Sequence, residues 1–485
     1  MKKTRTRFAP SPTGYMHIGN LRTALFEYLI TKHDGGDFIL RIEDTDQQRQ
    51  VEGATEIIYD TLREVGLHWD EGPDIGGEYG PYIQSEGLPM YKQYALDLID
   101  KGGAHYCFCS QEQIEQQKAA GGFGYVDPCK KLSLQEVKER LENGDEYVIR
   151  QTIDPEGVTS FDDEVYGHIE VDKEELDEQI LLKSDGFPTY NFANIIDDHQ
   201  MNISHVVRGN EYLSSTPKYN LIYDAYGWQR PIYVHVPPVM KDEHHKLSKR
   251  NGDASFQDLK EKGYLPQAIL NYIALLGWAP QSEQEIYTLD ELIEAFDIKR
   301  ISKAPAIFDI DKLTWMNGMY IREMDPDAFY QRISGILDEC LKKEYDKKRI
   351  AQLVQTRIEI INKENIVSLI DFLDTMDENY DLDMYRHKRQ KSSKESALPV
   401  LKEVYRQLSN FDRWEEDALH ELLLAIPAQM ELKNGVVLWP VRTALSGKAS
   451  TPGGAIELAY LLGKEESLRR IQLGIDRLEK DLQQG

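Results

Sequence analysis

The first fifty residues contain the pattern that most restricts the fold, because a strand, a helix and a second strand follow one another. Residues 6–9 are β-prone and end at two prolines, and apolar side chains then recur at helical spacing over residues 21–29. Two glycines at positions 35 and 36 end the helical pattern, and residues 38–42 form a mainly apolar run. Two strands joined by a helix imply a right-handed parallel crossover, the unit of a doubly wound α/β sheet.

The loops that follow these two strands are where such a sheet binds its ligands. Ligands of open α/β sheets lie beyond the carboxyl ends of the strands, so the loop after Ala9 and the segment from Glu43 face one crevice. His17 and the backbone N–H groups around it stand at the predicted start of the helix, where free donors and partial positive charge suit a phosphate. Gly19 would let a planar base approach the backbone closely.

The α/β pattern is interrupted once and later stops. Strand-like patterns lapse between about residues 105 and 180 and then resume at residues 180–183, 191–196, 206–208 and 232–236. An α/β domain split by an insertion explains this order. After residue 246 the chain turns helical, and residues 325–484 show almost no period-two alternation. We therefore predict an all-α C-terminal part of two helical bundles, divided near residue 375.

The charge of the chain limits the kind of partner it can bind. Its formal net charge is −26 at pH 7, whereas proteins that coat nucleic acid through phosphate contacts are usually basic. Residues 151–180 alone hold eleven acidic residues and one basic residue, while residues 321–485 carry a net charge of only −4. Any nucleic-acid partner must therefore be held by local basic patches, which we expect in the C-terminal third.

The sequence contains no signal for a membrane or for export. No apolar run approaches the ~18 residues needed to cross a bilayer, and no apolar stretch follows the basic N-terminus. We therefore expect a cytosolic protein without a membrane partner. Its four cysteines are too few for a disulfide framework in a chain of 485 residues.

A basic loop later in the chain changes the interpretation of the His17 loop. Residues 246–250 (KLSKR) follow the last predicted strand, and alone they would be read as a solvated surface loop. Together the two loops resemble the HIGH and KMSKS motifs of class I aminoacyl-tRNA synthetases. Residues 7–14 (RFAPSPTG), 41–46 (RIEDTD) and 182–190 (LKSDGFPTY) narrow the resemblance to bacterial glutamyl-tRNA synthetases. Asn20 departs from the HIGH motif, which ends in histidine, and this family tolerates that change.

The resemblance implies an architecture and a set of partners. The fold would be a split Rossmann-like parallel sheet with an inserted acceptor-binding domain, followed by an all-α anticodon-binding part. The implied partners are L-glutamate, ATP with Mg²⁺, and tRNA(Glu) or also tRNA(Gln), with no DNA partner, and the protein would act as a monomer. The implied domains are a catalytic domain in two halves (1–105 and 181–245), an acceptor-stem insertion (106–180), a connecting domain with the basic loop (246–322), and two anticodon-binding domains (323–375 and 376–485).

The residues of the implied glutamate site suit their task. Glutamate presents two carboxylates and one ammonium group, and Arg7 and Arg208 can each meet a carboxylate with two parallel N–H groups. Glu43 would take the ammonium group. Neutral hydrogen bonds would come from Ser11, Tyr190 and Asn194. Without the family pattern, Arg7 and Arg208 would be read as members of salt bridges, and Tyr190 as a core aromatic residue.

The implied chemistry needs no protein nucleophile. The α-carboxylate of glutamate attacks the α-phosphate of ATP, and a ribose hydroxyl of tRNA then attacks the activated carbonyl group. Catalysis would therefore depend on positioning and on stabilising charge that develops on the phosphates, with His17 on one side and Lys249 on the other. Further contacts with ATP are expected from Gly19, Asn20, Glu211 and Lys246.

Three cysteines lie close in the sequence, in the predicted insertion. Cys107, Cys109 and Cys129 can bind Zn²⁺, which usually takes four ligands, and some relatives carry zinc in this insertion. Tyr125 or His105 would complete the set. The alternative interpretation is three reduced thiols without a metal.

Other functions remain open at this point. A glutaminyl enzyme, a shortened relative that glutamylates a modified queuosine base, and a non-catalytic tRNA-binding paralogue use the same scaffold. The helical C-terminal third argues against the first two, and intact Arg7, His17, Glu43, Arg208 and Lys249 argue against the third. Candidate anticodon contacts, chosen by charge and location, are Arg357, Arg386, Lys388, Arg389 and Arg442.

Overall fold

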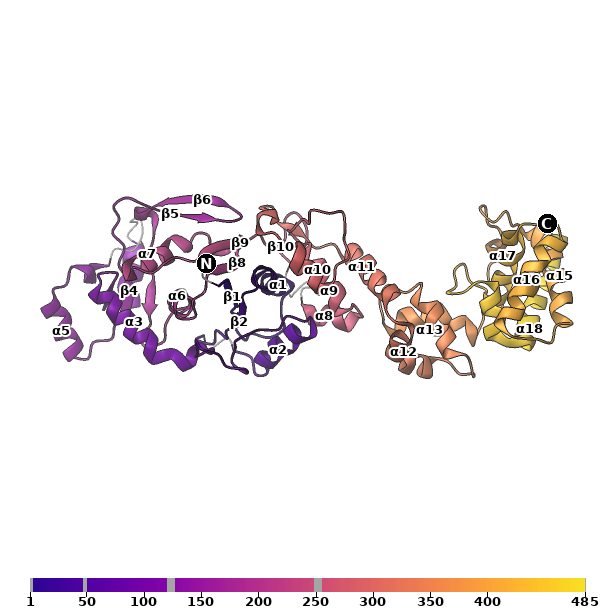
Figure 1. The fold of residues 1–485 in the computed structure, drawn as a ribbon, viewed down its shortest axis with the longest axis horizontal. Coiled ribbons are helices and arrows are strands. Elements are labelled where there is room, and N and C mark those ends of the chain that lie inside the picture. The colour runs from indigo at the N-terminus through magenta and orange to yellow at the C-terminus, as the bar shows by residue number, and fades with distance from the viewer. Residues whose placement is uncertain (1–2, 47–49, 120–126, 248–254, 485) are drawn as a thin grey trace. The chain divides into compact units, whose positions relative to one another are not determined.

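The computed structural model describes residues 3–46, 50–119, 127–247 and 255–484. The chain divides into two compact units, one made of residues 1–261 and 265–313, the other of residues 262–264 and 314–485 (Figure 1). This division falls inside one helix, α11 (Ile310–Glu323). Within the described residues no helix combines the length and the apolar character that crossing a membrane requires.

The predicted crossover near the N-terminus is confirmed. Strand β1 (Arg5–Phe8) pairs in parallel with β2 (Asp37–Leu40), and helix α1 (Ile18–His33) joins them. Helix α1 packs on β1 and β2 and also contacts α9 (Pro266–Ala274) and α10 (Leu289–Ala295). Because it has neighbours on several sides, α1 is apolar over most of its circumference rather than along one stripe.

A four-stranded sheet has the order β6-β5-β9-β8. Strands β8 (His205–Gly209) and β9 (Ile232–Val236) are parallel, and β5 (Val158–Asp163) joins β9 in parallel through Asp163 and Tyr233. Strand β6 (Gly167–Asp172) completes an antiparallel hairpin with β5 (Figure 1). The backbone N–H of Ser204 donates to the carbonyl of Arg5, which connects the start of β8 with β1.

Two expectations about this region are wrong. Residues 191–196, expected as a strand, lie in helix α6 (Tyr190–Gln200), because a short apolar run fits a buried helix as well as a strand. Residues 105–180, expected to lack strands, contain β5, β6 and also β4 (Val148–Gln151). The polar side chains of β5 and β6 hid their alternation.

A separate antiparallel sheet has the order β3-β4-β7. Its other two strands are β3 (Ala104–Cys107) and β7 (Ile180–Leu182). The expected strand at residues 180–183 therefore exists, but it pairs with β4 and not with the parallel sheet. The remaining elements of the first unit are α2 (Ala54–Glu64), α3 (Leu88–Asp100), α4 (Gln111–Ala119), α5 (Leu134–Glu142), α7 (Thr216–Tyr226), α8 (Phe256–Lys262), and the two-residue strands β10 (Val239–Met240) and β11 (Ala306–Ile307).

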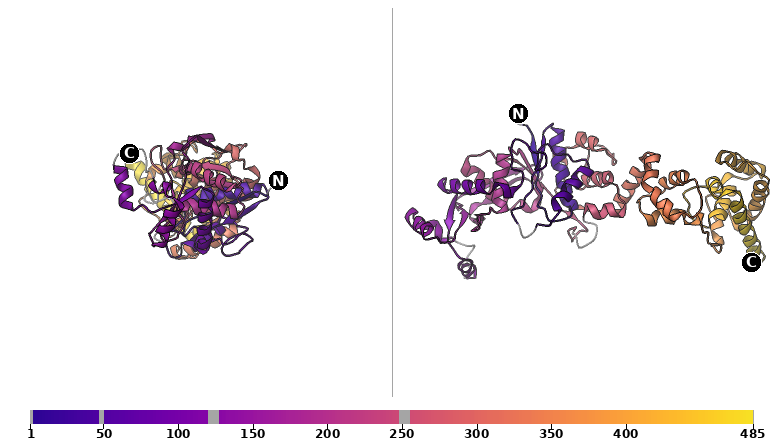
Figure 2. Two further views of the ribbon diagram at one scale, coloured as in Figure 1. Left: turned by 90° about the vertical axis from the view of Figure 1, so that its left-hand side faces the viewer. Right: turned by 90° about the horizontal axis from the view of Figure 1, so that it is seen from below.

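The named elements among the described residues of the second unit are all helices, which confirms the predicted all-α C-terminal part (Figure 2). Its longest helix, α18, changes direction at Gly463, where φ is 76°. Arg470 on α18 is fully buried and donates to the carbonyls of Phe372 and Leu445, so it joins three segments of the unit. The helices after α11 are α12 (Pro326–Cys340), α13 (Lys347–Gln355), α14 (Lys363–Ile370), α15 (Lys394–Ser409), α16 (Glu416–Gln429), α17 (Asn434–Ser446) and α18 (Ala455–Gln484).

Candidate functional site

His17 stands at the N-terminus of α1, as the sequence predicts. Its Nδ1 accepts a hydrogen bond from the backbone N–H of Gly19 at 3.0 Å, so the ring proton lies on Nε2. Nε2 is 3.1 Å from the carbonyl oxygen of Leu247, to which it donates. Leu247 is the second residue of the basic loop and the last one described there, and Lys249 lies outside the described residues. The histidine loop and the start of the basic loop are therefore in contact.

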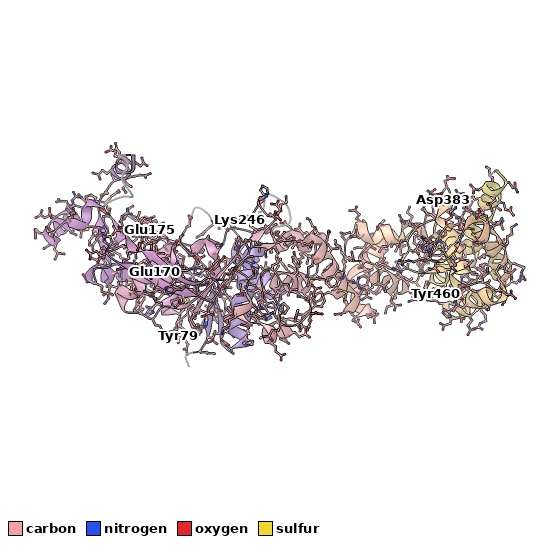
Figure 3. The ribbon with its side chains drawn as sticks, turned by 90° about the horizontal axis from the view of Figure 1, so that it is seen from above. Tyr79, Glu170, Glu175, Lys246, Asp383 and Tyr460 are labelled. Atoms are coloured by element: carbon pink, nitrogen blue, oxygen red, sulfur yellow. The ribbon has the colours of Figure 1, made fainter. Side chains whose placement is uncertain are left out.

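Three of the other expected nucleotide contacts, Gly19, Asn20 and Lys246, belong to these two loops. Asn20 and Lys246 are exposed, and Lys246 is labelled in Figure 3. The backbone of Lys246 pairs with that of Met240 on β10 in an isolated antiparallel β-bridge. Glu211 follows the end of β8, and its carboxylate occupies the space that a side chain at Gly209 would need. A glycine at this position thus allows the acid to fold back over the strand end.

A buried cluster of ionic side chains surrounds Arg7 near the end of β1. Arg7 Nε donates to Asp198 Oδ1 at 2.8 Å, and Arg7 Nη1 donates to Glu27 Oε1 at 3.2 Å. Arg41, just after β2, donates to the same Asp198 oxygen at 2.8 Å and to Glu43 Oε1 at 2.9 Å. All five side chains are buried. Arg7 is therefore both a member of buried salt bridges and close to Glu43.

The cluster holds more carboxyl groups than guanidinium groups, which shifts their pKa values apart. Burial raises the pKa of Glu43 to about 7, even though Arg41 acts in the opposite direction. Burial likewise raises the pKa of Glu27 well above its usual value. Burial also opposes ionisation of Asp198, but Arg7 and Arg41 outweigh it and lower the pKa of Asp198. An added cation would favour the ionised form of Glu43, so the cluster suits an ammonium group.

Arg208, near the carboxyl end of β8, is 6% exposed. Its Nε donates to His235 Nε2 at 3.1 Å, and its Nη2 donates to Thr216 Oγ1 at 2.7 Å. Tyr190 lies nearby: burial raises its pKa well above the usual value, and the charges of Glu43 and Arg208 both act on it. The structure thus gathers Arg7, Glu43, Tyr190 and Arg208 in one region of the fold.

The two remaining expected glutamate contacts differ in their surroundings. Asn194 is buried on α6 and donates from Nδ2 to the carbonyl of Tyr190 at 2.8 Å. Ser11 is exposed in the loop after β1, where its carbonyl accepts from Thr13 N.

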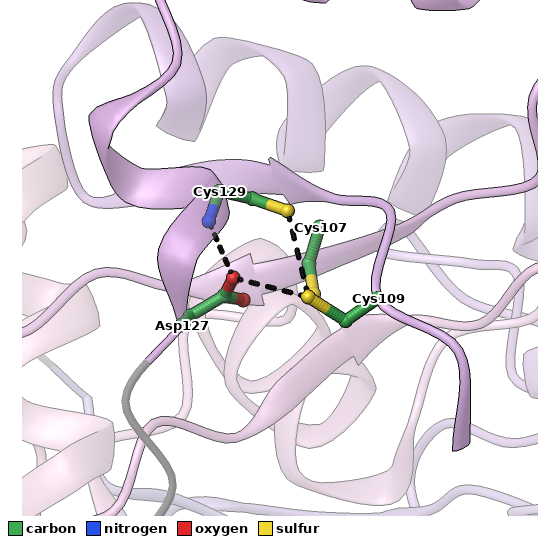
Figure 4. Close-up of side chains that lie close together, drawn as sticks. All are labelled: Cys107, Cys109, Asp127 and Cys129. Atoms are coloured by element: carbon green, nitrogen blue, oxygen red, sulfur yellow. Dashed lines mark hydrogen bonds between the residues drawn. The ribbon is translucent and has the colours of Figure 1, made fainter. Parts of the chain in front are cut away.

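The three cysteines of the insertion come together with an acid that sequence reasoning missed. One ligand atom each from Cys107, Cys109, Asp127 and Cys129 lies within 4.8 Å of the others (Figure 4). Asp127 begins a short 3₁₀ turn, and its Oδ1 accepts from Cys129 N at 2.8 Å, which holds the carboxylate beside the thiols. Three sulfurs and one carboxylate oxygen form a donor set that fits Zn²⁺.

The two expected fourth ligands do not lie in this described group. Tyr125 lies outside the described residues. His105 instead faces the acid, with its Nε2 3.1 Å from Asp127 Oδ2, so His105 orients Asp127 rather than joining the sulfurs. The signal that could have identified Asp127 is an acid two residues before Cys129, at the N-cap of a turn.

A pocket of about 370 Å³ in the second unit contains two of the expected anticodon contacts, Arg357 and Arg442. Arg442 packs over the Trp439 ring at 4.2 Å and donates to Thr451 Oγ1 at 3.2 Å. Burial and, second, the charge of Arg357 lower the pKa of Arg442 to about 10. The other three candidates are Arg386, Lys388 and Arg389. Of these, Arg386 has its Nε 3.7 Å from Oδ1 of Asp383, which is labelled in Figure 3.

Comparison with known proteins identifies the family. Residues 3–315 match the catalytic domain of class I tRNA synthetases (E and Q), and residues 327–475 match an anticodon binding domain. A glutamate–tRNA ligase of Clostridium botulinum strain Hall is 56% identical over 482 residues, which covers 98% of this chain and 99% of that protein. The chain belongs to the glutamate–tRNA ligase family. Another member of this family, from Clostridium tetani, is 54% identical over 99% of both chains.

A solved structure from the same family has the same fold. The glutamate–tRNA ligase of Elizabethkingia meningosepticum, crystallised in complex with its amino acid, superposes with a TM-score of 0.85 at 34% identity. The match covers 98% of this chain and all of that chain. The protein therefore consists of a class I catalytic domain with a parallel sheet, followed by a helical anticodon domain.

Sequence reasoning did not find the groups that surround the expected site residues. Arg41 donates to Glu43, and Glu27 accepts from Arg7. Around Arg208 lie Asp163, His235 and Thr216. A signal was present for some of them. Charged or polar side chains are unusual in a core unless they have a partner. Arg41 directly follows an apolar strand, and His235 lies within the apolar run at residues 232–236, so both indicated buried partners.

Proposed function

We propose that this member of the family activates L-glutamate with ATP and then transfers it to the 3′-terminal adenosine of tRNA(Glu). The observation that carries the proposal is the placement of Arg7, Glu43 and Arg208 near the carboxyl ends of β1, β2 and β8, in the same unit as His17. A site for a doubly carboxylated amino acid and a site for a phosphate thus belong to one α/β crevice.

Glutamate would bind through its three charged groups. Its ammonium group would pair with Glu43, whose pKa of about 7 then falls as the carboxylate is stabilised by the new cation. Its two carboxylates would accept hydrogen bonds from Arg208 and from Arg7. The Nε and Nη1 groups of Arg7 already donate to Asp198 and Glu27, so Nη2 of Arg7 is the group that remains for the substrate. Neutral hydrogen bonds would come from Ser11, Tyr190 and Asn194.

Activation would then proceed by direct attack of the α-carboxylate on the α-phosphate, with pyrophosphate leaving. The Nε2 proton of His17, which Leu247 accepts in the free protein, would be donated to the phosphates. Lys249 would supply the second positive group. Gly19, Asn20, Glu211 and Lys246 would hold the nucleotide, and Mg²⁺ would enter with ATP and neutralise phosphate charge.

The insertion would hold a structural Zn²⁺. Cys107, Cys109 and Cys129 provide three thiolates, and Asp127 or Tyr125 would provide the fourth ligand. The metal would fix the loop after β3 against the turn that begins at Asp127. Metal analysis of the undialysed protein should give one zinc per chain, and a value well below one would contradict the assignment.

The helical unit would read the anticodon of tRNA. The pocket beside Trp439 offers an aromatic face, and Arg357 and Arg442 offer charged donors, a combination that suits an unstacked base. Arg386, Lys388 and Arg389 would contribute phosphate contacts. We further propose that the protein acts as a monomer, which light scattering at assay concentration tests.

The activation step has a direct test. ATP–pyrophosphate exchange, with tRNA(Glu) present, should depend on L-glutamate and should be far weaker with L-glutamine or L-aspartate at the same concentration. Exchange that is equal with glutamine would contradict the proposed carboxylate recognition. An absence of exchange with all three amino acids would contradict the proposed activity itself.

A further inference from the structure

Three buried polar side chains extend inward from Arg208 and form one hydrogen-bonded chain. Arg208 on β8 and His235 on β9 are register partners in the parallel ladder, so their side chains lie next to each other. Asp163 ends β5, the neighbouring strand on the other side of β9. Asp163, His235 and Thr216 are at most 4% exposed, so solvent does not compete for their hydrogen bonds.

The Asp163 carboxylate determines which nitrogen of His235 carries the proton. Its Oδ2 accepts from His235 N at 3.0 Å and lies 2.7 Å from His235 Nδ1, and its Oδ1 accepts from Val165 N at 2.9 Å and Tyr166 N at 2.8 Å. The Asp163 carboxylate can only accept hydrogen bonds in this arrangement, so the ring nitrogen that faces it, Nδ1, must carry the proton. His235 Nε2 is therefore left as an acceptor directed at Arg208.

Arg208 is held along one edge of its guanidinium group. Its Nε donates to His235 Nε2, and its Nη2 donates to Thr216 Oγ1, which itself donates to the carbonyl of Tyr212 at 2.8 Å. The rings of Tyr212 and Tyr219 lie 5.3 and 4.8 Å from the guanidinium carbon. Each donated bond fixes one N–H direction, so the plane of the group is set and Nη1 is the nitrogen that remains for a ligand.

We propose that Asp163, His235 and Thr216 are positioning residues that fix the guanidinium plane of Arg208 for a carboxylate of glutamate. The inference rests on the role of Arg208 given under Proposed function. A free arginine side chain loses rotamer freedom when it binds a carboxylate, and an anchored one has lost it already, so the anchor strengthens glutamate binding. The neutral state of His235 is essential, because a second proton would turn its acceptor into a donor facing the arginine.

Two substitutions at residue 235 separate positioning from simple packing. His235→Asn keeps a donor at the place of Nδ1 and can still bind Asp163, but it has no atom that reaches Arg208. His235→Gln is longer and places its amide oxygen near the former Nε2, where it can accept from Arg208. We measure KM for glutamate and for ATP by pyrophosphate exchange with tRNA(Glu) present, and the melting temperature of each variant.

We expect His235→Asn to raise KM for glutamate about tenfold or more, the scale of one hydrogen bond to a charged group, with KM for ATP changed less than about twofold. His235→Gln should restore most of the loss at a similar melting temperature. The control is His205→Asn, which removes a partly buried histidine at the opposite end of the same strand β8 and should leave both KM values unchanged. An unchanged glutamate KM in His235→Asn, an equal loss in both variants, or an equal rise in the KM for ATP would overturn the proposal.

Two further variants keep the test decisive. If neither His235 variant folds, Thr216→Val and Thr216→Ser decide it: valine should raise KM for glutamate and serine should not, and a valine variant with normal KM would overturn the proposal. Arg208→Lys separates the two levels of the argument. A normal glutamate KM in Arg208→Lys would refute the role of Arg208 itself, whereas a raised KM there beside a normal one in His235→Asn would refute only the positioning chain.

Discussion

The substitution Glu43→Gln tests the electrostatics of the glutamate site through its pH dependence. Burial raises the pKa of Glu43 from 4.5 to about 7, although Arg41, which donates to its carboxylate, lowers it. Substrate ammonium binds the ionised form, so binding weakens as the pH falls through 7. For a pKa of about 7, KM for glutamate should rise roughly eightfold between pH 7.5 and pH 6, because protonation removes the competent form. The glutamine side chain of the variant has no proton to lose, so its KM should be uniformly high and flat over this range.

The same shift predicts a change in stability with a definite sign. In the folded protein Glu43 binds its proton more tightly than in the unfolded chain, so the unfolded chain releases the proton first as the pH rises. The free energy of unfolding of the wild type should therefore fall relative to Glu43→Gln between pH 4.5 and pH 8, by about 3 kcal/mol for this pKa difference. Urea unfolding at both pH values measures this change.

The pH dependence of KM for glutamate is measured by pyrophosphate exchange at pH 6.0, 6.5, 7.0 and 7.5 with tRNA(Glu) present. KM for ATP in the same reactions is the internal control. A wild-type KM for glutamate that stays constant over this range would refute the reasoning. So would a Glu43→Gln variant with the same pH profile as the wild type.

Four further predictions concern the other parts of the molecule. Lys249→Ala should slow adenylate formation by ~10²-fold or more in single-turnover kinetics, while equilibrium dialysis should show that glutamate binding is retained. Unchanged single-turnover activation would contradict the role of Lys249. Arg442→Ala should raise KM for tRNA(Glu) about tenfold and leave KM for glutamate unchanged. Arg406→Ala, a control at an exposed residue of α15 that pairs with Glu403, should change KM for tRNA less than about twofold. Cys109→Ser should lower the zinc content well below that of the wild type by mass spectrometry, and equal zinc in both would remove Cys109 from the site. Affinity for tRNA should fall steeply between low and physiological salt in filter binding, and a flat salt dependence would contradict binding through local basic patches.

The sequence alone predicts a secondary-structure element correctly where its apolar periodicity fits only a helix or only a strand. The crossover at residues 5–40 was predictable because its strands are short, its helix is long and glycines separate them. The helical second unit was predictable because no period-two alternation competes with the helical period there. The strand predicted at residues 191–196 is wrong because helix α6 is buried on several sides, so its apolar residues do not form a single helical stripe in the sequence.

The positions of the site residues could be anticipated, but their partners could not. His17 and Cys107, Cys109 and Cys129 lie where sequence patterns place them. The hydrogen bonds of Arg7 to Asp198 and of Arg208 to His235 join residues that are 191 and 27 positions apart, and only the packing of the sheet brings them together. Local patterns carry no information about such contacts.

Aminoacylation tests the central claim most directly. Labelled L-glutamate, ATP and purified tRNA(Glu) or tRNA(Gln) are incubated with the protein, and the label on each tRNA is measured. The account predicts rapid charging of tRNA(Glu) that is lost in the absence of ATP; label on tRNA(Gln) as well would widen the substrate range without changing the activity. Failure to charge either tRNA, with a correctly folded protein, would contradict the account.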